Sequence, residues 1–483
     1  MRLLVSGRWA PWVRTTVVVG LIAMTSACQV GPPYQAQHPD VPEKWATEVP
    51  SGSPSWPAPD WWAAFKDPEL NRLMDQARAG NPDVAASMYR VREADSQAQI
   101  AGAPLLPSVG VSAAAGPERQ LTLRGQERSH VLYQGMINVQ YELDFWGKNK
   151  SALESAKASA NAARFAQQVV WLTTSTDVAN LYFQNLALLD RLQTARDNLA
   201  RAQHALDAVV LAEHQGTVPH LAVVQEQAAV ASLEAVVPPL QQQLAATRNA
   251  LAILVGVLPE ELKLSGRSLA DLTQPEVNVG MPAGLLARRP DIQEAEANLI
   301  AANANIRVAR AQFFPSFTLP LSAGIQSMSV PGGTVPPIDA YSLLGSLTQP
   351  IFEGGALRGK LNQSKARYQE LLVGTYRQSV LSAFSDAETA LSALRYAETE
   401  KSAQQQSAAL AQQSSGMALT SLRGGTGTTL DVLQSQTAVY NAQDALAQAR
   451  LAYVQAVLSV IKALGTGSGC HQSACREAQF RNG

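Results

Sequence analysis

The chain has 483 residues, of which 46% are hydrophobic but only 6% aromatic and 16% charged. Alanine is abundant, and alanine-rich helix faces let helices approach closely without building one thick core. The formal net charge of -1 argues against nucleic acid or another polyanion as a partner.

The N-terminus carries the features of an export signal. An apolar run at 17–24 follows three arginines and is too short to span a bilayer, which is typical of a secretory signal. The run leads through small residues to Cys28, in a pattern that resembles a bacterial lipobox although Thr25 replaces the usual leucine. We expect residues 1–27 to be removed and Cys28 to carry lipid. Ordinary cleavage without lipidation is the alternative.

Residues 28–65 are rich in proline and tryptophan, which indicates an extended arm. After this arm, the same order of segments occurs twice. The stretch from Asn81 to Val109 returns 208 residues later, and Gly216-Thr217 returns 209 residues later as Gly425-Thr426. We therefore predict two copies of one unit, an equatorial linker between them and a short tail. The predicted boundaries are 66–256 for the first copy, 257–288 for the linker, 289–465 for the second copy and 466–483 for the tail.

The longest uninterrupted segment runs from Lys148 to Gln215 without glycine or proline. One α-helix over it would be roughly 100 Å long, far longer than the core of a compact domain. Its apolar residues follow a heptad seam with one polar member: Leu181, Asn185, Leu188, Leu192, Ala195, Leu199, Ala202, Leu206 and Val209. The other faces are polar, so we predict a coiled-coil wall whose broad sides face water.

Two shorter helices are expected to pair with this long helix. The pattern predicts a return helix over His220–Val255 and a helix before the strands over Pro82–Gly102, with Pro290–Gln312 as its second-copy counterpart. Together they nearly match the long helix in length, so we expect them to stack end to end. Pro238-Pro239 are expected to bend the return helix.

Each copy also contains two segments in which apolar and polar residues alternate. In the first copy Tyr133, Ile137, Val139, Tyr141 and Leu143 lie on one face and Gln134, Asn138, Gln140, Glu142 and Asp144 on the other. In the second copy Phe313, Phe317, Leu319, Leu321 and Ile325 oppose Ser316, Thr318, Ser322 and Gln326. Such strands of about ten residues are typical of a transmembrane β-barrel. A soluble two-faced sheet is the alternative, but the secretory signal favours the barrel.

Four strands cannot close a barrel, which needs about eight or more, and lipid does not tolerate open strand edges. Several protomers must therefore share one barrel, and three would give twelve strands. The predicted fold class is mainly α with a transmembrane β part, in which several copies of the chain share one barrel; the trimeric twelve-stranded form that continues into a long helical tunnel is what the family resemblance given next implies.

At this point the sequence resembles the TolC-like outer-membrane factors, and within them the lipoprotein branch that works with resistance-nodulation-division pumps. The matching stretches begin at Cys28, Tyr141, Arg288, Ala311, Gln349, Leu430 and Lys462, and read CQVGPPY, YELDFWG, RRPD, AQFFPS, QPIFEGG, LDVL and KALG. The resemblance implies a homotrimer in the bacterial outer membrane, with a periplasmic tunnel met by an adaptor protein and an inner-membrane pump.

The resemblance also places two kinds of functional site. The turns between the long helices, Gln215-Gly216-Thr217 and Gly424-Gly425-Thr426, are expected to meet the adaptor. Asp431 takes the place of an aspartate that lines the periplasmic entrance, although the helix start alone also favours an acidic residue. Gln434 stands where some relatives have a second acidic residue, which predicts a weaker charged ring.

Other chemistries are disfavoured. The stretch from Gly354 to Lys360 fits part of a phosphate-binding loop, but Leu361 removes the hydroxyl that would bind Mg²⁺. Cys470 and Cys475 could form a small disulfide, and metal binding together with His471 is a weaker alternative. We expect no enzyme activity, and no cofactor besides a covalent lipid on Cys28.

The sequence thus predicts a passive exit duct for small toxic compounds or drugs, lipid-anchored in the outer membrane with a large periplasmic portion. The alternatives are a channel for protein secretion and, from another class, a structural trimeric coiled coil. The sequence does not identify the cargo.

Overall fold

The structure is a computed structural model that describes residues 30–37, 39–47, 57–121, 127–273, 275, 280–330 and 333–465. The predicted signal peptide, Cys28 and the tail with Cys470, His471 and Cys475 lie outside these residues. The described chain forms two compact units. Unit 1 holds the described parts of Met1–His38, Val91–Ala163 and Ala295–Tyr376, and unit 2 those of Pro39–Arg90, Arg164–Glu294 and Arg377–Gly483.

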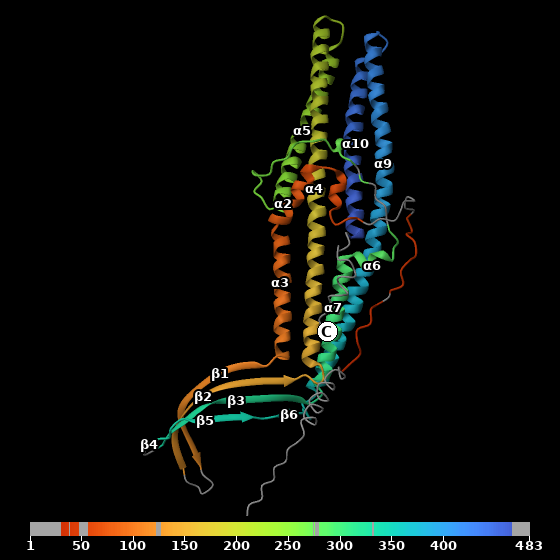
Figure 1. Cartoon of the computed structure of the whole chain (residues 1–483). Coiled ribbons are helices and arrows are strands. Elements are labelled where there is room, and N and C mark those ends of the chain that lie inside the picture. Colours follow the sequence, from red (N-terminus) through yellow and green to blue (C-terminus); the bar gives the residue numbers. More distant parts are fainter. Residues whose placement is uncertain are drawn as a thin grey trace, which may run out of the picture. The chain divides into compact units, whose positions relative to one another are not determined.

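Long helices dominate the chain (Figure 1). The first half contains α2 (Pro68–Gly80), α3 (Pro82–Gly102), α4 (Lys148–His214) and α5 (His220–Val255). The second half contains α6 (Gly284–Arg288), α7 (Pro290–Ala311), α8 (Ala356–Glu370), a π-helical segment (Leu371–Arg377), α9 (Gln378–Arg423) and α10 (Thr429–Leu464). The predicted bounds of α3, α4, α5 and α7 are confirmed to within one residue. None of the described helices combines the length and hydropathy needed to cross a bilayer.

Unit 1 contains one antiparallel sheet, visible in Figure 1 as β1, β2, β3 and β5 side by side. Its long strands are β1 (Ser108–Leu121), β2 (Glu127–Leu143) and β3 (Ser316–Val330). Three short fragments, β4 (Gly333–Thr334), β5 (Ile338–Leu343) and β6 (Ser346–Thr348), all pair with β3. The six fragments therefore occupy four strand positions, and the long strands exceed the predicted ten residues.

Two residues predicted to lie in strands fall outside them. Asp144 follows β2, which ends at Leu143. Phe313 lies before β3, because its backbone N–H donates to the carbonyl of Arg310 (3.1 Å) and keeps it in the turn that ends α7.

The register gives the sheet one apolar and one polar face. Val111, Ile137, Ala323 and Tyr341 pair in one row across the strands, whereas Gly110, Asn138, Ser322 and Ser342 pair in the next. Successive residues of a strand point to opposite faces, so these rows lie on opposite sides. The apolar side chains are uncovered, with Val111 81% and Tyr341 86% exposed. A large exposed apolar face of this kind marks a surface that interacts with a membrane or with another protein.

Unit 2 has its core where the end of the N-terminal arm meets the helices. The short 3-10 helix Trp61–Phe65 and α2 pack with α4, α5 and α10 around Tyr182, Phe183 and Leu186, which are fully buried. The prediction that both broad sides of α4 face water is therefore wrong around Tyr182, Phe183 and Leu186. The reason is that the arm and the residues after α5 cover its other faces.

Helix ends meet at two junctions in unit 2. The side chain of Asn81, before α3, donates to the carbonyl of Leu254 near the end of α5 (2.8 Å). The side chain of Arg289, before α7, donates to the carbonyl of Ala463 near the end of α10 (3.1 Å). A donor outside the helix thus satisfies a carbonyl that the helix end leaves free. The predicted end-to-end stacking of return helix and pre-strand helix is confirmed at both junctions.

Gly256, which ends α5, makes the first junction possible. It has φ +81°, and a Cβ there would lie 2.1 Å from the carbonyl oxygen of Gly80. Gly216 has nearly the same backbone, φ +73°, but open space around it. Gly216→Ala should therefore lose only about 1–2 kcal/mol of unfolding free energy, the cost of a left-handed alanine.

Gly256→Ala should lose about 1–3 kcal/mol more, because the added methyl group also overpacks the junction. Denaturant unfolding of the purified proteins in detergent compares the two variants. Equal losses would contradict a close contact at this junction.

Candidate functional site

The first inter-helix turn, between α4 and α5, is a Schellman motif. The N–H of Thr217 donates to the carbonyl of Ala212 (3.0 Å), and the N–H of Gly216 to that of Glu213 (2.7 Å). This pattern requires a left-handed residue at the position of Gly216. The backbone N–H groups of the turn therefore supply donors to the last free carbonyls of α4.

The second turn, between α9 and α10, repeats this geometry. The N–H of Thr426 donates to Ser421 O (3.0 Å) and that of Gly425 to Leu422 O (3.1 Å), with Gly425 at φ +75°. Gly424 has helical φ and ψ angles and so does not depend on being glycine. All six predicted docking residues, Gln215, Gly216, Thr217, Gly424, Gly425 and Thr426, are exposed, and each set of three lies at the free end of its hairpin (Figure 1).

Asp431 belongs to a capping box at the start of α10. Its carboxylate accepts hydrogen bonds from the backbone N–H (2.8 Å) and hydroxyl (2.7 Å) of Thr428, while its own N–H donates to that hydroxyl oxygen (3.2 Å). These bonds from Thr428, the hydroxyl first, lower the pKa of Asp431, so the exposed side chain is anionic at neutral pH.

The first hairpin starts its return helix differently. The residue before α5 is Pro219, which provides no side-chain cap, and Ala222 stands at the position that corresponds to Asp431. There His220 Nδ1 lies 2.7 Å from the carboxylate of Glu213, across the turn. The carboxylate at the start of the return helix is thus a feature of the second hairpin.

A groove of about 650 Å³ lies along the second hairpin beside Asp431. Its lining is polar and apolar in similar measure: Leu410, Gln413, Ser414, Met417, Ala418, Ser421, Asp431, Gln434 and Ser435. Gln434, predicted to weaken an acidic ring, therefore shares this surface with Asp431.

The sequence did not reveal an ion pair that links the two hairpins. Arg191 of α4 binds Asp444 of α10 through Nε (2.6 Å) and Nη2 (3.2 Å), a two-point ion pair with both side chains largely buried. Farther along α4 and α10, Gln455 donates to Asn180 (2.9 Å). No local pattern marks these residues, because each partner lies more than 250 positions away.

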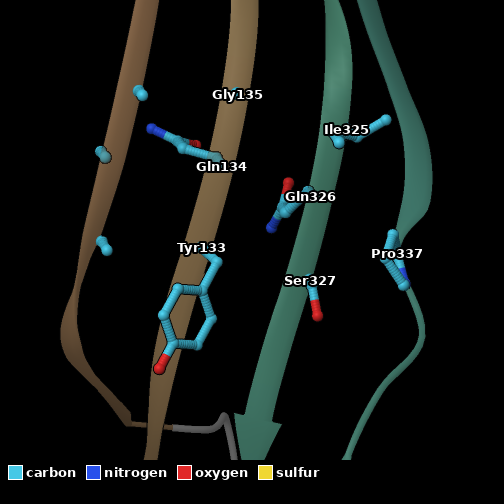
Figure 2. Close-up of a pocket in the computed structure, with 10 residues that line it drawn as sticks. Tyr133, Gln134, Gly135, Ile325, Gln326, Ser327 and Pro337 are labelled. Atoms are coloured by element: carbon cyan, nitrogen blue, oxygen red, sulfur yellow. The ribbon is translucent and has the colours of Figure 1, made fainter.

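Around Gln134 and Asn138 the polar face of the sheet carries uncharged amides and hydroxyls. Asn138 donates to Ser112 (2.8 Å), Ser322 and Ser342 share a hydrogen bond (2.8 Å), and Gln134 pairs with Gln326 in register. Figure 2 shows Gln134 and Gln326 side by side in a hollow of about 480 Å³, which is otherwise lined mainly by apolar groups of β1, β2 and β3 and by Pro337. Such a surface can hydrogen-bond water and polar solutes.

Aromatic rings gather where the strands meet the helices. Trp146 stacks on Phe314, with ring centroids 4.8 Å apart, and its indole N–H donates to the carbonyl of Pro315 (2.8 Å). The N–H of Val30 donates to the carbonyl of Trp146 (3.4 Å). Val30, the first described residue, therefore lies beside this aromatic cluster, and in the sequence it follows Cys28 by two positions.

The glycines of the stretch that resembles a phosphate-binding loop act as a strand-to-helix corner. Gly354 and Gly355 have φ +60° and +90° and precede α8, as Gly147 at φ +70° precedes α4. No cluster of His, Cys, Asp and Glu suited to a metal ion occurs in the part of the chain that the structure describes.

Comparison with known proteins places the chain in one family. The model for outer membrane efflux proteins matches residues 73–257 and 281–466. The pyoverdine export outer membrane protein OpmQ of Pseudomonas putida is 37% identical over 434 residues, which cover 88% of this chain and 92% of that protein. Relatives named for efflux of antibiotics, cations and toluene are 27–29% identical.

Solved channels share the fold as well. The outer-membrane channel OprN is 28% identical with a TM-score of 0.79, covering 91% of this chain and 99% of OprN. VceC of Vibrio cholerae is 28% identical with a TM-score of 0.77, covering 85% of this chain and all of VceC. The chain belongs to the outer membrane efflux protein family.

Proposed function

We propose that this chain is the outer-membrane exit duct of a tripartite efflux pump, a passive channel that receives cargo from a periplasmic adaptor and an inner-membrane pump. The observation that carries the proposal is the sheet of unit 1, with an uncovered apolar face and a polar face. A sheet of this kind suits lipid on one side and water on the other. The family supports the same role.

The edges of the sheet support a shared barrel. Within the described residues β1 pairs only with β2, and the fragments β4, β5 and β6 pair only with β3. Unpaired backbone groups cost several kcal/mol each in lipid. Three protomers, each a duplicated unit with four strand positions, would pair these edges in a barrel of about twelve strands.

The cargo is proposed to be a small solute. The relatives are named for export of pyoverdine and for efflux of antibiotics, toluene and cations, all small compared with a secreted protein. The greater identity to the pyoverdine exporters favours a cargo of the pyoverdine type. A protein-secretion channel and a structural coiled coil have no comparable support.

The duct is tested by single-channel recording in planar bilayers, where the wild type should conduct. Threefold symmetry would bring three Asp431 carboxylates around one axis, where they attract cations. Asp431→Asn keeps an oxygen that can accept the bonds from Thr428 but removes the charge. It should therefore lower cation selectivity and weaken divalent block.

Thr428→Ala is the matched control, because it weakens the cap and keeps the charge. Its selectivity should stay near that of the wild type. If the two variants have the same selectivity and divalent block, Asp431 only caps the helix, and other residues determine the width and charge of the entrance.

The exposed turns are proposed as the adaptor contact. Gly216 and Gly425 are poor positions to test, since any side chain there is strained by positive φ. Gly424 has a helical backbone, so Gly424→Trp adds bulk at the turn with little strain. This variant should lose crosslinking to the adaptor and efflux while trimers, measured by native mass spectrometry, persist.

Gln406→Trp, at an exposed position in the middle of α9, serves as the control for bulk alone. Full efflux by Gly424→Trp, or equal loss in both variants, would count against docking at the turn.

We also propose a lipid on Cys28. The contact of Val30 with Trp146 puts the start of the described chain beside an aromatic cluster of the kind found at membrane interfaces. Mass spectrometry of the mature N-terminal peptide should find a diacylglyceryl cysteine. Cys28→Ala, if exported, should remain largely in the outer-membrane fraction, and its release into the periplasm would mean that the strands do not span.

A further inference from the structure

The polar face of the sheet can be followed to the last pairs of its strands. The pairing of β2 with β1 and with β3 runs without a break, so the even-numbered residues of β2 and β3 all lie on the face of Asn138 and Ser322. We call this the inner face. Along β3 it is the more covered of the two, because Ser322 and Gln326 are half-buried whereas Leu321 and Ile325, on the opposite face, are exposed. Side chains crowd together on the concave side of a curved sheet, so the inner face is the concave one.

The inner face becomes apolar at the end of the sheet away from the helices, where β4 lies (Figure 1). Gln134 and Gln326 pair across β2 and β3, and the next inner residues beyond them are Leu132 and Met328, which also pair directly. On β5, Ile338 lies opposite Gln326 on the same face. Leu132, Met328 and Ile338 together are called the collar.

On β3 and β5 the opposite face becomes polar at the same level. Ser327 and Ser329 flank Met328 in the chain, and Asp339 follows Ile338, so these three polar residues lie on the face that is apolar nearer the helices. Serines and a carboxylate are poorly suited to contact with lipid chains. The apolar band of these two strands therefore ends before the level of the collar.

Pairing within the sheet explains only part of the collar. Apolar residues opposite each other on neighbouring strands stabilise a sheet, which is sufficient reason for Leu132 and Met328. It does not account for Ile338, which is 52% exposed, or for Val330, the next inner residue of β3, which is 42% exposed. Exposed apolar side chains gathered on one face mark a surface that contacts an apolar ligand.

We propose that Leu132, Met328 and Ile338 determine specificity: in the shared barrel they surround the exit and favour solutes with an exposed apolar part over compact hydrated ions. The inference rests on the proposed function, because only in a shared barrel does the inner face enclose the path of the cargo. A solute with alkyl or aromatic groups buries apolar surface against the collar. A hydrated ion instead leaves the amides of Gln134 and Gln326 for side chains that offer it no hydrogen bond.

The test makes the collar polar without changing its size, in a variant that combines Leu132→Asn, Met328→Gln and Ile338→Thr. Single channels in planar bilayers are blocked with tetraethylammonium and with tetrabutylammonium, which carry the same charge but differ in apolar area. Tetrabutylammonium should block the wild type at about tenfold lower concentration than tetraethylammonium, and this ratio should fall to about twofold in the variant.

Val131→Ser is the matched control. Val131 is the neighbour of Leu132 in β2 and lies on the opposite face, paired with Ser329. The substitution therefore removes an apolar side chain at the same level but outside the collar, and the blocking ratio should stay that of the wild type.

Ile338→Thr alone is the variant to use if the combined variant forms no channels. Ile338 is exposed and threonine keeps its branched Cβ, so the strand should form normally. The blocking ratio should then fall by about threefold.

Three outcomes would overturn the collar. They are a wild-type blocking ratio in conducting channels of the polar variants, an equal loss of the ratio in Val131→Ser, and equal block of the wild type by the two ions. Absence of conductance in the wild type is a separate result that would reject the proposed duct itself.

Discussion

Each long helix of this protein is matched by two shorter helices laid end to end, and the carbonyls at the junction must find donors. Asn81 supplies one to Leu254 and Arg289 supplies one to Ala463, at equivalent places in the two halves. Arg289 also binds Asp291 and Asp386. The same backbone requirement is thus met by an amide in one half and by an ion-pair network in the other. Without these donors the return helices would end in buried, unpaired carbonyls.

The sheet, unlike the helix junctions, has backbone groups and side chains for which the chain itself provides no partner among the described residues. Its backbone is paired inside but not at its outer strands, and its apolar face has no cover within the protomer. A stable protomer in water would have buried that face. In the proposed shared barrel, lipid would cover the apolar face and strands of neighbouring copies would pair the edges.

The two hairpins share a turn and differ just beyond it. Both close with the same Schellman bonds, but only the second continues into a capping box with a carboxylate. It is also the second that contains the π-helical segment. The carboxylate cap and the π-helical segment thus belong to the second half alone, whereas the turn geometry common to both hairpins follows from the need for a left-handed residue.

Local chemistry made much of this predictable. A run free of glycine and proline predicted α4, and alternation predicted the two faces of the sheet, because side-chain direction follows directly from helix and strand geometry. The return of Gly216-Thr217 as Gly425-Thr426 predicted the two turns, since glycine tolerates positive φ.

Only the tertiary structure decided the features that depend on distant partners. The ion pair between Arg191 and Asp444 and the covered faces of α4 come from segments far apart in the chain. The numbering already contained the shift from 208 to 209 between the halves. Yet the sequence cannot say where a helix absorbs an extra residue, because that depends on which neighbouring side chains hold the helix on either side.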